Sequence, residues 1–160
     1  MFKFRKLQKE YIRCLRKCQE TKGMIQLYYR FRLHRLSIKT QIQIPYTTKI
    51  GDRFSIGHLG RVIINPGSEI GNHVCVNTGV TIGQENRGKR KGCPIIGNQV
   101  WIGSNAVIVG KIKIGNDVLI APNAYVNFDV PDHSVVVGNP GTIHHSKHAT
   151  RDYLNEVSEE

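Results

Sequence analysis

His58 is the first residue whose type and position could do chemistry. Isoleucine followed by glycine occurs at Ile50-Gly51 and, six residues later, at Ile56-Gly57, but the next in-phase isoleucine, Ile64, comes only after eight residues. His58 stands inside that interruption. Imidazole has a pKa near neutrality, so this side chain could take a proton from a hydroxyl group as a general base. A purely structural histidine remains the alternative.

A metal site is the other chemistry open to histidine. Zinc sites in proteins usually draw several histidine or cysteine ligands together. No histidine stands between residues 74 and 132, so the usual pair of closely spaced ligands is missing from the middle of the chain. We therefore expect no metal.

A second interruption, QENRGKRKGCPI at residues 84–95, separates Ile82 from Ile96. It is polar and strongly basic. Arginine and lysine would suit the phosphates of a ligand or an acidic acceptor, although a solvated mobile loop is the alternative. Cys93 could form an acyl-enzyme, but no activating neighbour is evident in the sequence. We expect Cys93 to line the acceptor pocket, with two to eight residues extruded as a loop.

These two interruptions break a repeat of six residues. A period of six fits neither an amphipathic helix nor a two-faced strand, and it is typical of a parallel β-helix in which three short sides make one coil. About 100 residues at roughly 18 per coil predict five to six coils. Insertions in such a solenoid project from the regular core, so function is expected at the breaks. The in-phase positions are Ile44, Ile50, Ile56, Ile64, Ile70, Val76, Ile82, Ile96, Ile102, Ile108, Ile114, Ile120 and Val126.

The net charge of +11 belongs mostly to the N-terminal segment. Up to Thr40 there are twelve Lys and Arg against Glu10 and Glu20, a balance of +10. Apolar residues at helical spacing predict a basic helical segment over 1–43, followed by a β-helix over 44–143 and a tail over 144–160. The basic segment could cap the solenoid, contact another subunit or meet an anionic membrane surface. No nucleic-acid motif accompanies the charge, so we expect no nucleic-acid partner.

The apolar pattern and the cysteines of the sequence indicate the cellular compartment. No run of about eighteen apolar residues is present, and the N-terminus lacks the apolar stretch of a secretory signal. Four cysteines, with no C-x-x-C pair, are expected to be free thiols in a reducing environment. These features predict a cytoplasmic protein, with membrane association as an open alternative.

Residues 44–143 resemble the left-handed β-helix acyltransferases, in particular their serine acetyltransferase-like branch. The likeness rests on IGDRFSIGH (50–58), GVTIG (79–83), VWIGSNAVIVGKIKIG (100–115) and VPDHSVVVGNPG (130–141). It implies a mainly β fold, a homotrimer with clefts between subunits, and acetyl-CoA as donor. It also implies His58 as general base. The resemblance further implies that Ser104, Ala121 and Pro122 line the pantetheine arm of the cofactor. We also expect Gly83 to bind the cofactor, and Asn77, Arg87 and Cys93 to bind the acceptor.

The chain departs from that branch at three positions. Serine acetyltransferases carry an aspartate before the histidine, where this chain has Gly57, and an Arg-His pair in the loop, where it has Gly92 and Cys93. These departures favour an O-acetyltransferase that acts on a sugar hydroxyl in surface polysaccharide synthesis. Serine is the alternative acceptor. A non-catalytic β-helix scaffold is the alternative of another class, and a metal-dependent hydratase is a more distant one.

Overall fold

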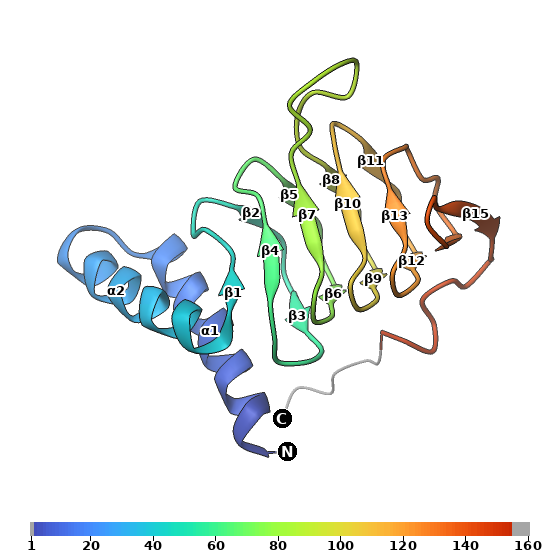
Figure 1. Ribbon diagram of the computed structural model, residues 1–160. Coiled ribbons are helices and arrows are strands. Elements are labelled where there is room, and N and C mark those ends of the chain that lie inside the picture. The colour runs from blue at the N-terminus through green and yellow to red at the C-terminus, as the bar shows by residue number, and fades with distance from the viewer. Residues whose placement is uncertain (1, 155–160) are drawn as a thin grey trace.

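The computed structural model describes residues 2–154, with side chains from Lys6 onward. Two helices come first, α1 (Phe2–Glu20) and α2 (Gly23–Thr40), and a β-helix follows (Figure 1). Within the described residues there are fifteen strands. Their bounds are β1 Ile42–Gln43, β2 Lys49–Ile50, β3 Ser55–Ile56, β4 Val62–Ile64, β5 Glu69–Ile70, β6 Val74–Val76, β7 Thr81–Gly83, β8 Ile95–Ile96, β9 Val100–Ile102, β10 Val107–Val109, β11 Lys113–Ile114, β12 Val118–Ile120, β13 Tyr125–Val126, β14 Ser134–Val137 and β15 Thr142–His145.

Every third strand joins the same sheet, which makes a three-sided prism. Sheet A has the order β1-β4-β7-β10-β13, sheet B the order β11-β8-β5-β2, and sheet C the order β15-β14-β12-β9-β6-β3. All neighbours are parallel except β14 and β15. Four coils have three strands each. A fifth consists of β13, a bridge at Val130 and β14. The expectation of a left-handed β-helix with an N-terminal helical segment is confirmed.

The register within sheet A locates both interruptions. Ile64 pairs with Ile82, so a regular coil takes 18 residues. Ile42 pairs with Val62 after 20 residues, and Ile82 with Ile108 after 26. The first coil is therefore two residues longer than the regular one, and the coil with the basic loop is eight longer. The strands before and after each insertion stay in register because both insertions lie in corner turns between strands.

The core is a continuous stack of aliphatic side chains, and glycine is needed where coils touch. Ile82, Ile102 and Ile120 are completely buried. A β-carbon at Gly71 would lie 2.5 Å from the carbonyl oxygen of Gly97, one coil away. Only glycine tolerates so close a backbone. A ladder of side-chain oxygens runs beside these glycines: Asn72, Asn98, Asn116 and Asp132 each accept a backbone N–H from the preceding coil.

Helix α1 covers the open N-terminal end of the prism. The hydroxyl of Tyr11, completely buried, donates to the Ile44 carbonyl and accepts from the Ile44 N–H. Arg16 donates to the carbonyls of Ile50 and Gly51, which belong to the unpaired edge of the first coil. These bonds satisfy backbone groups that a solenoid end would otherwise leave open.

The last described residues fold back over sheet C. Thr150 donates to Asp117 through its N–H and its hydroxyl, and His133 Nδ1 lies 2.8 Å from the same carboxylate. Tyr153 packs on Trp101 with ring centroids 4.7 Å apart. Residues 155–160, the end of the expected C-terminal tail, lie outside the described residues. No helix among residues 2–154 combines the length and apolarity needed to cross a membrane.

Candidate functional site

The predicted site residues fall into two groups at opposite edges of sheet A. We call the corner where sheet C passes to sheet A the histidine edge. It consists of the turns at residues 57–61, 77–80, 103–106 and 121–124. The corner where sheet A passes to sheet B carries the basic loop at residues 84–94 and is the loop edge. Figure 1 shows the β7–β8 loop projecting beyond one end of sheet A, with the β3–β4 turn at the other end.

The histidine edge brings together five of the predicted residues. Stacking of the coils places the turns that carry His58, Asn77 and Ser104 in one column, with Ala121 and Pro122 at the next level. The described neighbours of His58 form no hydrogen bond with it, and its side chain is exposed. The imidazole is thus free to meet a hydroxyl group.

Backbone contacts hold the turn that presents His58. The Gly57 N–H donates to the Val76 carbonyl at 2.9 Å. Asn77 is buried and donates its side-chain amide to the Ile102 carbonyl at 3.0 Å. A β-carbon at Gly57 would come far inside van der Waals distance of Asn77 Oδ1. The residue before His58 therefore has no room for a side chain while Asn77 keeps this position.

Small residues continue along the same column. A β-carbon at Gly103 would lie 2.5 Å from the Pro122 nitrogen, so the third and fourth coils are in direct backbone contact there. The Asn123 N–H donates to the Ser104 carbonyl at 2.9 Å, and Asn123 adopts a left-handed conformation. Ser104, Ala121 and Pro122 put short side chains on this part of the edge, beside Asn105 and Asn123. A thin, extended ligand such as a pantetheine arm could lie along such an edge.

The loop edge is a short hairpin. Glu85 and Gly92 exchange two backbone hydrogen bonds of 2.9 Å, and the Lys111 N–H donates to the Arg90 carbonyl at 2.8 Å. The Glu85 carboxylate accepts the N–H of Arg87, which orders the tip of the loop. Gly83 lies just before this hairpin, at the end of β7. Four exposed cations project from the loop: Arg87, Lys89, Arg90 and Lys91.

Cys93 lies at the base of the loop and is not set up as a nucleophile. Its sulfur contacts Asn65 Oδ1 at 3.3 Å and is half-buried. Burial raises the pKa of the Cys93 thiol, which lowers the fraction of reactive thiolate. Asn65 was not singled out from the sequence, because it stands 28 positions before Cys93 and only the coiling brings the two together.

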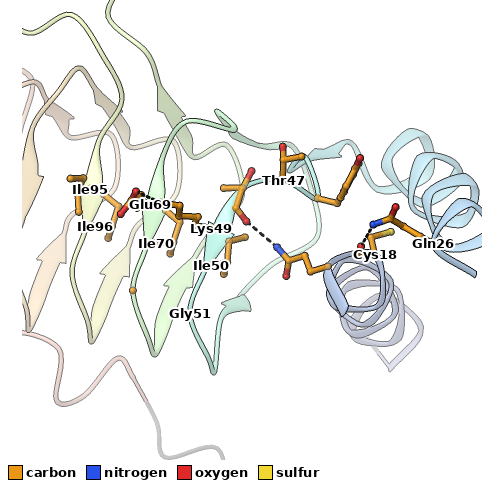
Figure 2. A pocket seen from close by; sticks show the side chains of 14 residues that line it. Cys18, Gln26, Thr47, Lys49, Ile50, Gly51, Glu69, Ile70, Ile95 and Ile96 are labelled. Carbon is orange, nitrogen blue, oxygen red and sulfur yellow. Dashed lines mark hydrogen bonds and ion pairs between the residues drawn. The ribbon is translucent and has the colours of Figure 1, made fainter. Parts of the chain in front are cut away.

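A groove among the described residues lies elsewhere. It has a volume of about 680 Å³ and runs between the helices and sheet B (Figure 2). Lys49 and Glu69 form an ion pair of 2.7 Å in its wall. None of the predicted site residues lines it, so the chemistry is not expected there. Among the described residues, no cluster of three or more His, Cys, Asp or Glu side chains could hold a metal ion.

Comparisons with known proteins agree on one kind of enzyme. A family profile described as bacterial transferase hexapeptide (six repeats) matches residues 93–127. The serine acetyltransferase of Bacillus pumilus is 39% identical over 104 residues, which is 65% of this chain and 48% of that relative. The crystal structure of Neisseria gonorrhoeae serine acetyltransferase matches with a TM-score of 0.73 and 25% identity, covering 92% of this chain and 58% of the other. A serine acetyltransferase in complex with CoA matches with a TM-score of 0.72 and 25% identity, covering 84% and 55%. The chain thus spans about half the length of the curated relatives that it matches.

These relatives correct the expected acceptor. The sequence favoured a sugar in polysaccharide synthesis, whereas the matched proteins are serine acetyltransferases. The expectation rested on Gly57, Gly92 and Cys93, which stand where serine acetyltransferases carry other residues. Gly57 lies against Asn77, and Gly92 has a φ of +136° that disfavours any side chain. The sulfur of Cys93 packs beside Gly67.

Proposed function

The chain belongs to the hexapeptide-repeat, left-handed β-helix acyltransferases, in their serine acetyltransferase-like branch, and from that premise we propose that it transfers an acetyl group from acetyl-CoA to the hydroxyl of serine. The observation that carries the proposal is the place of His58. It is an exposed imidazole in the first coil, at the head of a column of short side chains. The relatives support serine as the acceptor and acetyl-CoA as the donor.

The proposed reaction is a direct transfer. The serine hydroxyl oxygen attacks the thioester carbonyl carbon while its proton passes to His58. The carbon–sulfur bond then breaks, and CoA leaves as a thiol after recovering that proton. A general base of this kind contributes about 10² to 10⁴ in rate. Neither a metal nor an acyl-cysteine takes part in this scheme.

The proposed enzyme is a homotrimer. Within one chain the histidine edge and the loop edge lie at opposite ends of sheet A (Figure 1). Packing prisms side by side can bring the loop edge of one subunit to the histidine edge of its neighbour. The site would then combine His58 and Asn77 of one copy with Arg87 and Cys93 of another. Acetyl-CoA would lie between them, along Ser104, Ala121 and Pro122 of one copy and beside Gly83 of the other.

Residues 44–143 are proposed as the catalytic unit, with 1–43 and 144–160 as flanking segments. We place the reaction in the cytoplasm, because all four cysteines are free and a reducing compartment keeps thiols in that state.

Release of CoA thiol in the presence of L-serine tests the proposal. L-Alanine is the matched control acceptor because it lacks only the hydroxyl group. We expect steady release with L-serine and none above background with L-alanine. If acetyl-CoA binds but L-serine gives no turnover, serine is the wrong acceptor. If acetyl-CoA does not bind at all, the chain is a non-catalytic β-helix scaffold.

A further inference from the structure

Helix α2 exposes an apolar stripe that the proposed reaction does not use. The side chains of Met24, Phe31 and Ile38 are 81%, 61% and 70% exposed. These positions lie seven residues apart, so they follow one side of the helix. Leu27 and Tyr28 are also exposed and fill the intervening turns. A run of this length on a globular protein usually marks a contact surface.

The stripe is not left over from packing against the rest of the chain. The inner side of α2 is buried through Leu33, Leu36 and Thr40. Figure 1 shows α2 at the outer end of the molecule, beyond α1 and β1 and far from the β7–β8 loop. The stripe therefore faces away from the β-helix and does not belong to either edge of the proposed site.

Cations flank the stripe, and α2 contains no Asp or Glu. Arg35 and Lys39 are exposed on the helix, whereas the guanidinium of Arg30 lies 5.1 Å from the centre of the Tyr46 ring, toward the β-helix. Arg32 is paired with Glu10 of α1. The guanidinium of Arg35 lies 6.0 Å from the centre of the Phe31 ring, so charge and apolar surface are interleaved.

This charge distribution disfavours pairing of α2 with itself. If α2 packed against α2 of a second copy, Arg35 and Lys39 of both chains would be brought together with no carboxylate on either helix to compensate. An anionic bilayer matches both parts of this surface. Its phosphate and carboxylate headgroups can pair with the cations, and its acyl chains can accept the apolar side chains. A helix of eighteen residues could lie in that interface over about 27 Å.

We propose that α2 binds the surface of an anionic lipid membrane, with the Met24–Phe31–Ile38 stripe inserted at the headgroup boundary and Arg35 and Lys39 at the level of the phosphates. The protein is thereby a peripheral membrane protein attached through its N-terminal helices, and the β-helix stays in the aqueous phase. This attachment does not depend on the proposed acetyl transfer.

Sedimentation with vesicles tests the attachment on the full chain. Vesicles of phosphatidylcholine alone are compared with vesicles that contain about one third phosphatidylserine. We expect binding to the anionic vesicles only, and we expect it to weaken as salt is raised. Equal binding to both kinds of vesicle, or none to the anionic vesicles, would overturn the proposal.

Two double variants separate the contributions of the surface. Phe31→Ser with Ile38→Ser removes apolar area, and Arg35→Gln with Lys39→Gln removes charge. Each should weaken binding to anionic vesicles roughly tenfold or more. Ile143→Ser is the matched control, since Ile143 is also an exposed apolar residue but lies on β15. Equal loss in the control would contradict the assignment. So would a change of oligomeric state in the Phe31 and Ile38 variant, because the stripe would then be a subunit contact.

Discussion

Gly57 lies directly against the side-chain oxygen of Asn77, one coil further along the β-helix. While Asn77 keeps this position, the residue before His58 has no room for a side chain. The Asn77 amide is in turn tied to the Ile102 carbonyl, so Asn77 cannot move away without giving up a buried hydrogen bond. If His58 acts as the proposed general base, it does so without a carboxylate on the preceding residue.

A double-mutant cycle tests the Gly57–Asn77 contact. Gly57 does not have a positive φ, so alanine there is disfavoured only by its β-carbon. We expect Gly57→Ala to lower the free energy of unfolding by about 1 to 3 kcal/mol through overpacking. In an Asn77→Ala background the same change should be much less destabilising. Urea unfolding of the four proteins measures the coupling, and purely additive effects would show that the two residues do not meet.

Cys93 should be dispensable for acyl transfer. Burial raises the pKa of its thiol, and the hydrogen-bonding contacts of its sulfur among the described residues are the amide oxygens of Asn65 and Gln84, which are not bases. We expect Cys93→Ala to keep most of its kcat. Mass spectrometry of the wild type mixed with acetyl-CoA and no acceptor should show no acetylated Cys93. An acetyl-enzyme that forms and decays at the rate of turnover would replace direct transfer with a two-step mechanism.

If each site is shared between two subunits, two variants that are inactive alone should restore activity when they are mixed. One chain carries His58→Ala with an intact loop. The other keeps His58 and has residues 85–91 replaced by two glycines. Each homotrimer should be inactive. Trimers refolded from an equal mixture should recover activity at about one quarter of their sites, as random assembly gives. An inactive mixture of stable mixed trimers would place the whole site within one chain.

Acid should release the C-terminal segment from sheet C. Burial alone would raise the pKa of Asp117, but hydrogen bonds from His133, Thr150 and Ala149 outweigh it and leave the pKa lowered. Stability from a lowered carboxyl pKa is present above the ordinary value of 3.8 and is lost as the pH falls through the folded-state value. Trp101 is the only tryptophan and packs on Tyr153, so its fluorescence reports the release.

Asp117→Asn removes the charge and should loosen the segment already at neutral pH. Lost hydrogen bonds of this kind typically contribute about 1 to 3 kcal/mol. The acid step in Trp101 fluorescence should disappear in this variant. Asp152→Asn, at an exposed position, is the control. A step of the same size in Asp117→Asn would show that another group drives the change.

The fold was predictable because its signal is strictly periodic. Each in-phase isoleucine or valine reports one inward position, so the coils and the two extrusions follow from counting residues, and His58 stands out as the histidine in the first gap. Side-chain contacts between different coils leave no such periodic pattern in the sequence. Asn65 meets Cys93 from 28 positions away, and the Asp117 cluster needs a C-terminal segment that folds back. The acceptor was predicted wrongly because the residue types at Gly57, Gly92 and Cys93 were interpreted as lost binding groups. In the structure a β-carbon at Gly57 would meet Asn77, and Gly92 has a φ of +136°.

The central claim is that His58 is the general base of a serine acetyltransferase, and the most direct test is serine-dependent CoA release by His58→Ala. His58 is exposed and makes no hydrogen bond with described residues, so this variant should retain the melting temperature and oligomeric state of the wild type. Its kcat should fall by about 10² to 10⁴, with little change in the KM for acetyl-CoA. His34→Ala, at an exposed position on α2, should keep the full rate. A correctly assembled His58→Ala protein that releases CoA at the wild-type rate would contradict the account.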